Sequence, residues 1–205
     1  MSIQPTTLEP SHADSTPSHT PIPTTSSSTS STPQYQTREG TPADAQQISE
    51  LVGTTWSKLF GYSVSPTDLE QYITITLSPS SFEAELQSPQ NIFICAYSPS
   101  DESKIVGVAQ LVLDSKPSVD IPNSIELQRL YAHPSTHGTG LGQLLISESE
   151  EKARQLGKNK IWLGVWENNT RGIRFYGKVG FREVGEKVFF AGGSRRRDLV
   201  MCKDV

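Results

Sequence analysis

A chain of 205 residues, 34% hydrophobic and 20% charged, has the length and composition of a soluble protein with one full core. Its formal net charge is −4, and a protein without a basic surplus is not expected to bind nucleic acid. The sequence contains no apolar run that could span a bilayer, so no membrane partner is predicted. We expect a cytoplasmic protein, with the nucleus as the alternative compartment.

The first 37 residues differ from the rest, because Ser, Thr and Pro make up about two-thirds of them. Such a segment buries too little apolar surface to offset the entropy cost of ordering it. It has no Lys or Arg before Arg38, so neither a secretory signal nor an Arg-rich transit peptide is expected. We predict a disordered arm over residues 1–37 and one folded domain over residues 38–205.

The two cysteines, Cys95 and Cys202, lie in apolar strand-like runs, where reduced cysteines behave as small hydrophobic residues. Two separated cysteines supply neither a disulfide framework nor a metal site. No metal is therefore expected.

The predicted elements begin with a short strand that ends at Gly40. The residues Thr41-Pro42-Ala43-Asp44 form a helix start, with a capping threonine, a first-turn proline and an acidic residue. Apolar residues then recur at helical spacing over 48–59, and a second helical pattern covers 66–73. Two helices are therefore expected before the main sheet.

Six further strands are predicted, over residues 91–97, 104–113, 124–132, 161–165, 181–190 and 197–203. A glycine loop and a helix that stops at Gly157 separate the third and fourth of them, and a short helix covers 169–178. Strand, loop, helix and strand form a right-handed crossover between parallel strands. One such unit in a mostly antiparallel sheet does not fit a doubly wound dinucleotide fold.

The loop HGTGLG at residues 137–142 has three glycines at alternate positions before a helix. Glycine lets the backbone approach a ligand, and a helix start directs free N–H groups at an anion. The loop lacks the third glycine of the dinucleotide fingerprint and the Lys-Ser/Thr pair of a P-loop. A dinucleotide function would require Glu167, after the strand at 161–165, to bind a ribose.

Two segments, ELQRLYAHPSTHGTGLGQLL at 126–145 and WENNTRGIRFYGKVGF at 166–181, resemble the GNAT superfamily of acetyl-CoA-dependent N-acetyltransferases. The resemblance covers about residues 38–205. It implies a GNAT fold, an α/β domain whose mixed, mostly antiparallel twisted sheet contains a central βαβ crossover that binds acetyl-CoA. The expected function is transfer of an acetyl group to a primary amine by direct attack on the thioester.

The family's pyrophosphate loop corresponds here to His137, Gly140 and Gly142, with histidine in place of the usual Arg or Gln. In the family, the strand before this loop separates from its neighbour, and its backbone binds the pantetheine arm and the thioester carbonyl. An asparagine in the second segment also binds the pantetheine. The residues thus implied for acetyl-CoA are Leu130, Tyr131, Ala132, His137, Gly138, Thr139, Gly140, Leu141, Gly142 and Asn169.

The resemblance also implies two catalytic residues, Tyr176 and Glu126. A tyrosine at position 176 lies near the CoA sulfur as general acid, and a phenol with a pKa of about 10 is protonated at neutral pH. Several family members carry a glutamate at the spacing of Glu126 that accepts the amine's proton through water. Strand alternation places Glu126, Gln128 and Leu130 on one face, so Gln128 is expected to line the acceptor cleft. The alternatives are a packed core tyrosine and a solvated glutamate.

Within the superfamily, the chain most resembles PaiA-type polyamine acetyltransferases, through LQRLY and the ending GEKVFFAGG…RDLVMCK. Three arginines at 195–197 depart from that group and would repel a polyamine. We expect a small-molecule amine such as a polyamine. The alternatives are a protein lysine or N-terminus, and a catalytically silent CoA-binding sensor. The chain could also form a homodimer. The two N-terminal helices and their link, which carry Trp56, Phe60, Tyr62 and Tyr72, are expected to form one wall of the acceptor site, with one or two of these rings facing the acceptor.

Overall fold

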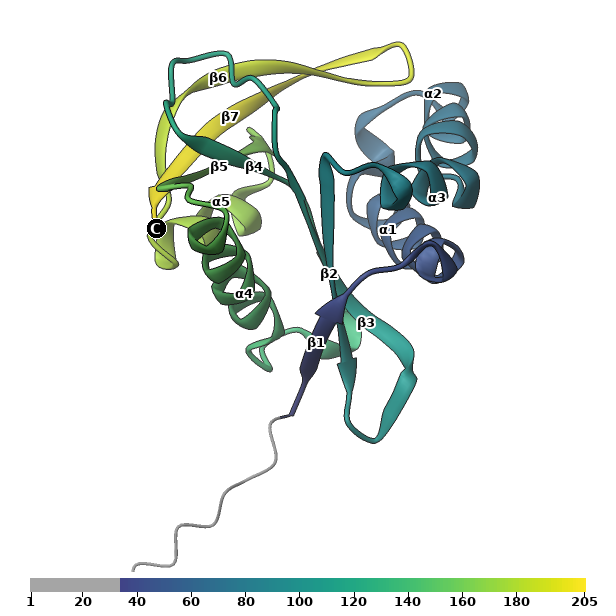
Figure 1. The fold of residues 1–205 in the computed structure, drawn as a ribbon. Helices are drawn as coiled ribbons and strands as arrows, with labels where there is room; N and C mark the ends of the chain where they lie inside the picture. The colour runs from purple at the N-terminus through teal and green to yellow at the C-terminus, as the bar shows by residue number, and fades with distance from the viewer. Residues whose placement is uncertain (1–33) are drawn as a thin grey trace, which may run out of the picture. The chain divides into compact units, whose positions relative to one another are not determined.

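The computed structural model describes residues 34–205, in which seven strands form one mixed sheet with helices on both faces (Figure 1). The strands are β1 (Gln36–Glu39), β2 (Asn91–Ser98), β3 (Asp101–Val112), β4 (Ser124–Ala132), β5 (Lys160–Trp166), β6 (Arg182–Ala191) and β7 (Ser194–Asp204). Their order across the sheet is β1-β2-β3-β4-β5-β7-β6. β4 and β5 are parallel, and the other neighbouring pairs are antiparallel. The predicted fold class is confirmed.

The arm predicted over residues 1–37 lies mostly outside the described residues. Gln36 and Thr37, which the prediction assigned to the arm, belong to β1 and pair with Tyr97 and Ala96 of β2. The folded domain therefore includes residues that sequence composition had grouped with the arm.

Three helices precede β2, so the prediction of two is wrong. They are α1 (Ala45–Phe60), α2 (Pro66–Gln71) and α3 (Pro79–Gln87). Ser78 caps α3 through its side chain, and Pro79 occupies the first turn. The helix was missed because α3 buries a single side chain completely, Phe82, and so shows little apolar periodicity.

The predicted crossover is confirmed, since α4 (Leu141–Gln155) connects β4 to β5. A short helix, α5 (Thr170–Lys178), follows β5. Within residues 34–205, no helix is both long and apolar enough to cross a membrane.

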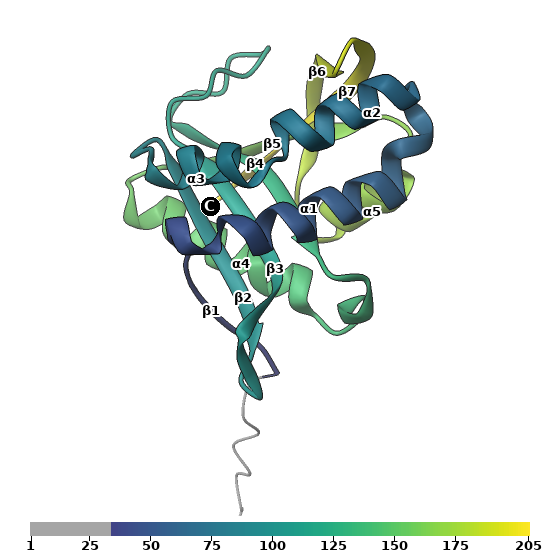
Figure 2. The ribbon, with the colours of Figure 1, turned by 90° about the vertical axis from the view of Figure 1, so that its right-hand side faces the viewer.

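The central strands of the sheet are buried on both faces, with α1 and α3 on one side and α4 on the other (Figures 1 and 2). β2 shows this alternation directly: Ile92 and Ile94 pack under α4, while Phe93 and Cys95 pack under α1 and α3. Burial raises the pKa of the Cys95 thiol to about 12, which agrees with a reduced core cysteine. Cys202 is only half-buried, contrary to expectation.

β7 begins at Ser194, whereas the predicted strand began at residue 197. The arginines at 195–197 therefore lie inside a strand, where neighbouring side chains point to opposite faces. Only Arg196 of the three is buried.

Candidate active site

The parallel strands β4 and β5 pair over a short length and then separate. Three residue pairs form their register: Ser124 with Lys160, Ile125 with Ile161, and Glu126 with Trp162. Beyond this point β4 continues to pair with β3, and β5 continues to pair with β7. Among residues 34–205, the backbone groups of 127–132 and 163–166 that face each other have no strand partner, so they can bond a molecule placed between them.

A β-bulge at Gln128 reverses the side-chain alternation expected for β4. Two successive residues of β3 pair with Arg129 and Leu127, which leaves Gln128 as the extra residue. Leu127 and Leu130 therefore both face the core beneath α4. The prediction that Glu126, Gln128 and Leu130 share one face is wrong, because the bulge places Leu130 on the face opposite Glu126.

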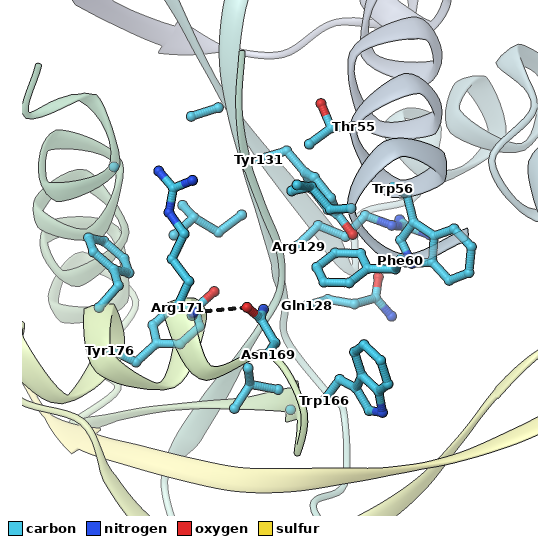
Figure 3. Close-up of a pocket in the computed structure, with 18 of the residues that line it drawn as sticks. Thr55, Trp56, Phe60, Gln128, Arg129, Tyr131, Trp166, Asn169, Arg171 and Tyr176 are labelled. Atoms are coloured by element: carbon cyan, nitrogen blue, oxygen red, sulfur yellow. Dashed lines mark hydrogen bonds between the residues drawn. The ribbon is translucent and has the colours of Figure 1, made fainter. Parts of the chain in front are cut away.

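A cavity of about 700 Å³ lies where the strands separate, lined by residues of α1, β4, the glycine loop, β5, α5, β6 and β7. This volume is in the range of small-molecule sites, about 300–1,000 Å³. Figure 3 shows Trp56 and Phe60 on one side of β4, with Arg171 and Tyr176 on the other. Gln128 also lines the cavity, and its role at the acceptor stays a prediction.

The glycine loop forms one end of this cavity. Gly138 and Gly140 have φ angles of +81° and +90°, and a Cβ at either would meet nothing within 4 Å. The N–H of Leu144 donates to the Gly140 carbonyl at 3.0 Å. Residues 141–143 come before that first helical bond, so their N–H groups have no partner within the helix, and no side chain among the described residues caps them. All three residues line the cavity. The arrangement suits an anion.

The short helix α5 is capped by Asn169, whose side-chain oxygen accepts the N–H of Gly172 at 2.9 Å (Figure 3). A Cβ at position 172 would overlap the Asn169 amide, so glycine there leaves room for the cap. Asn169 also lines the cavity.

Tyr176, two turns after Asn169 in α5, packs edge-on against Phe175 and Phe181, with ring centroids at 5.4 and 5.7 Å. Burial raises the pKa of Tyr176, so its hydroxyl keeps its proton at neutral pH. The side chain lines the cavity, and within residues 34–205 its hydroxyl has no hydrogen-bond partner. Tyr176 is therefore both packed and available to donate a proton.

The sequence pattern of the acetyltransferase (GNAT) family matches residues 46–181, which contain the glycine loop, the separated strands and α5. The chain belongs to this family. It is an N-acetyltransferase, and its co-substrate is acetyl-CoA.

Individual relatives agree with this assignment. An uncharacterized N-acetyltransferase of Lactobacillus delbrueckii subsp. lactis is 31% identical over 161 residues, covering 78% of this chain and 91% of the relative. A spermidine N(1)-acetyltransferase of Thermoplasma acidophilum is 26% identical over 140 residues, covering 68% of this chain and 83% of the relative. The crystal structure of PaiA N-acetyltransferase from T. acidophilum in complex with coenzyme A has the same fold. Its TM-score is 0.67 at 23% identity, covering 83% of this chain and 99% of PaiA.

The positions predicted for acetyl-CoA gather around the cavity of this acetyltransferase. They are Leu130, Tyr131, Ala132, His137, Gly138, Gly140, Leu141, Gly142 and Asn169. Thr139 does not line it, because the Thr139 hydroxyl donates to the Thr136 carbonyl at 2.6 Å. Backbone donors and open glycines fit a pyrophosphate, while the individual roles stay predictions. Among residues 34–205 no cluster of three or more His, Cys, Asp or Glu side chains could hold a metal.

Two side chains add to the electrostatics at the glycine loop. Burial lowers the pKa of His137 below its usual value, and nearby Arg171 and His133 lower it further. His137 is therefore neutral at neutral pH, and Arg171, which also lines the cavity (Figure 3), supplies the positive charge there.

Glu126 does not line the cavity, although it was predicted as the base. It is 4% exposed, Lys187 donates to its carboxylate at 2.9 Å, and the Ser115 hydroxyl donates to the other carboxylate oxygen at 2.5 Å. Lys187 also lies over the Trp162 ring, with its nitrogen 4.9 Å from the centroid. The Glu126 carboxylate is thus buried and already bonded to Lys187 and Ser115.

The opposite wall carries aromatic residues of α1 and of the helical turn that follows α2, together with two charged residues of β7. Trp56, Phe60 and Tyr72 line the cavity, while Tyr62 is 77% exposed and is absent from the lining. Arg196 and Asp198 also line it, and both are 7% exposed.

Sequence reasoning did not single out Arg171, Arg196 or Asp198 as site residues. Arg171 lies in the first turn of α5, where a cation opposes the helix dipole, and this unfavourable position could have marked it. Arg196 and Asp198 could have been found by extending the last strand to include RRRD, since alternate residues then share a face.

Proposed function

We propose that this acetyltransferase acetylates the primary amine of a small molecule by direct attack on the thioester of acetyl-CoA. The observation that carries the proposal is one continuous cavity of about 700 Å³, which joins the helix start of α4 to an aromatic wall on α1. The cavity volume lies in the range of small-molecule sites, about 300–1,000 Å³, and the acceptor would enter between the thioester and the aromatic wall.

Acetyl-CoA supplies an electrophilic carbonyl and a sulfur leaving group, and the chain supplies binding groups and protons. The N–H groups of residues 141–143 and the Arg171 guanidinium would hold the pyrophosphate, each charge-assisted hydrogen bond contributing about 1.5–3 kcal/mol. The unpaired backbone of Leu130, Tyr131 and Ala132 would bond the pantetheine arm and stabilise the oxyanion. Such a donor lowers the barrier by about 2.7–4 kcal/mol.

Tyr176 is proposed as the general acid. The amine loses one proton before attack, the C–N bond forms and the C–S bond breaks. The Tyr176 hydroxyl then protonates the departing thiolate and is reprotonated from solvent, while the amide nitrogen loses its second proton to solvent. Burial raises the pKa of Tyr176, so the hydroxyl carries its proton at neutral pH when the thiolate forms.

The role of Glu126 as base stays a prediction. Because its carboxylate is bonded to Lys187 and Ser115, it would act through an intervening group rather than by direct contact with the amine. If Glu126→Gln leaves the pH dependence of kcat/KM unchanged, Glu126 is not the base.

The polyamine acceptor also stays a prediction, as does the homodimer. A T. acidophilum relative is named a spermidine N(1)-acetyltransferase, which supports a polyamine. Arg196 counts against it, because a buried cation in the cavity repels a cationic chain. Acetylation of a protein lysine or N-terminus and a silent CoA-binding role are the competing functions.

The deciding experiment is release of free CoA thiol from acetyl-CoA by the purified full chain. The acceptors are spermidine, spermine, monoamines, amino acids and a lysine peptide. Release that depends on a small amine supports the proposal. Release with the lysine peptide alone, or none despite measurable acetyl-CoA binding, contradicts it.

A further inference from the structure

Arg196 is the one member of the arginine run that faces the cavity. Arg197, on the other face of β7, pairs with Glu167 at 2.9 Å and with Glu186 at 3.1 Å, and Arg195 is exposed. Arg196 is 7% exposed, and within residues 34–205 its Nε and Nη1 atoms have no hydrogen-bond partner.

Four aromatic rings surround the Arg196 guanidinium. Its Cζ atom lies 4.1 Å from the centroid of Trp166, 5.6 Å from those of Trp56 and Phe60, and 5.8 Å from that of Phe189. These contacts stabilise the cation through the ring faces and leave its N–H groups unused. A buried guanidinium with unused donors is poised for an anion, and a carboxylate matches its planar geometry.

Asp198 lies two residues further along the same face of β7 and is equally buried. Its Oδ1 atom has no hydrogen-bond partner among the described residues, since the nearby Lys187 pairs with Glu126 instead. Burial raises the pKa of Asp198, and the charges of Arg196 and Lys187 oppose that rise. Asp198 is therefore a carboxylate without a direct partner at the cavity wall.

We propose that the acceptor of this acetyltransferase is an amine that also carries a carboxylate a few bonds away, with Arg196 binding the carboxylate and Asp198 the ammonium group. Alternate strand positions lie roughly 7 Å apart, which suits two opposite charges on one small molecule. The rings of Trp56, Phe60, Trp166 and Phe189 would pack against an apolar side chain, as in a hydrophobic amino acid. The inference rests on the proposed function and narrows its substrate.

The test compares acid and ester forms of one acceptor. Phenylalanine and leucine, and their methyl esters, are assayed by thiol release with the wild type and with Arg196→Met. We expect Arg196→Met to lower kcat/KM for the acids about 10- to 100-fold and to change it little for the esters. The matched control is Arg195→Met, which removes the same charge from the exposed face of the same strand and should leave both substrates unaffected.

Two further variants distinguish loss of a substrate contact from a general folding defect. Arg196→Lys retains the charge and should recover part of the activity on the acids, because lysine lacks only the planar donor geometry. Asp198→Asn should lower activity on acids and esters alike, since both carry the ammonium group, while acetyl-CoA affinity stays unchanged.

The inference is overturned if Arg196→Met affects acids and esters equally, or if it weakens acetyl-CoA binding, which would place Arg196 in the co-substrate site. It also fails if spermidine is acetylated and amino acids are not, although the proposed function would then stand. Absence of thiol release with every amine, despite acetyl-CoA binding, overturns the proposed function itself.

Discussion

On the side of α4 and α5, the cavity presents backbone N–H groups and open glycines, with Arg171 as the added charge. On the side of α1 and β7, it presents aromatic rings and two buried charged side chains without hydrogen-bond partners among residues 34–205. The first side suits acetyl-CoA, which is the same whatever the acceptor, since its pyrophosphate needs only hydrogen-bond donors at a helix start. The second suits discrimination between acceptors, because buried charges without partners reject a ligand that cannot pair with them.

The largest expected effect comes from Tyr176→Phe, which removes the proposed acid at the boundary between the two sides. Turnover should fall about 10²-fold or more, because general acid catalysis contributes about 10²–10⁴-fold. Acetyl-CoA affinity should not change, as measured by titration calorimetry beside steady-state rates. The control is Tyr97→Phe, which loses only a bond to Gln36. Equal losses of rate and affinity would indicate a packing role instead.

Arg171→Met tests whether the co-substrate side depends on a side chain as well as on the backbone. We expect acetyl-CoA affinity to fall about 10- to 100-fold, because a charged hydrogen bond contributes about 1.5–3 kcal/mol. Arg174→Met, on an exposed position of the same helix, is the control and should bind normally. If Arg171→Met and Arg174→Met bind acetyl-CoA with similar affinity, the Arg171 side chain does not contribute and the backbone alone holds the pyrophosphate.

Gly140→Ala tests the backbone contribution itself. A residue with a Cβ at positive φ costs about 1–2 kcal/mol, so the loop bears that strain or rearranges away from the pyrophosphate. Acetyl-CoA affinity should fall about 5- to 30-fold. Gly157→Ala, at the other end of α4 with a φ of +70° and an equally open Cβ position, should lower Tm without changing that affinity. A normal affinity in Gly140→Ala would contradict the assigned cradle.

Asp68→Asn should affect only the acceptor side. Asp68 of α2 accepts the Gly193 N–H and the Ser194 hydroxyl, both at 2.6 Å, and so ties the β6–β7 turn to the helices. The bond from Ser194, followed by those from Gly193 and Ser65, lowers the pKa of Asp68. The tie should therefore weaken as pH falls below the ordinary value of about 3.8.

At neutral pH, Asp68→Asn should raise the amine KM a few-fold and leave acetyl-CoA affinity unchanged. Glu70→Gln, a charge removal on the same helix, is the control. A change in acetyl-CoA affinity would show that the two sides of the cavity are coupled.

The smallest effect is expected for His137→Ala. The pKa of His137 is lowered by burial, so the imidazole is neutral at pH 7.5, and its loss should change acetyl-CoA affinity less than about threefold. As pH falls through the usual histidine value of about 6.5 and below it, the protonated ring should strengthen binding in the wild type but not in His137→Ala. Identical pH profiles for the two proteins would rule out a side-chain contribution.

The co-substrate side could be predicted from the sequence because its signals are local. The loop 137–142 and the helix that follows are consecutive, so glycine spacing and helix start define the anion site together. Asn169 and Tyr176 likewise lie on one short helix, at positions that the family pattern marks. These elements were found close to where the structure has them.

The acceptor side could not be predicted in the same way. The bulge at Gln128 depends on how β3 pairs with β4, and no property of the ELQRLY segment reveals the extra residue. Glu126 was expected in the cleft, but it is buried outside the cavity lining and bonded to Ser115 and to Lys187, which is 61 residues away in sequence. Strict alternation along β4 therefore assigned the wrong face to Leu130, because it does not account for the bulge at Gln128.

The sequence by itself determined the family, the order of strands and helices around the crossover, and the residues of the glycine loop, since each rests on contacts between near neighbours in the chain. Only the tertiary structure decided which arginine of 195–197 faces the cavity, which rings surround it and where Glu126 points. Those outcomes depend on strand register and on helices packed from distant parts of the chain. Register and packing are set by the burial of the whole sheet, so a single segment does not specify them.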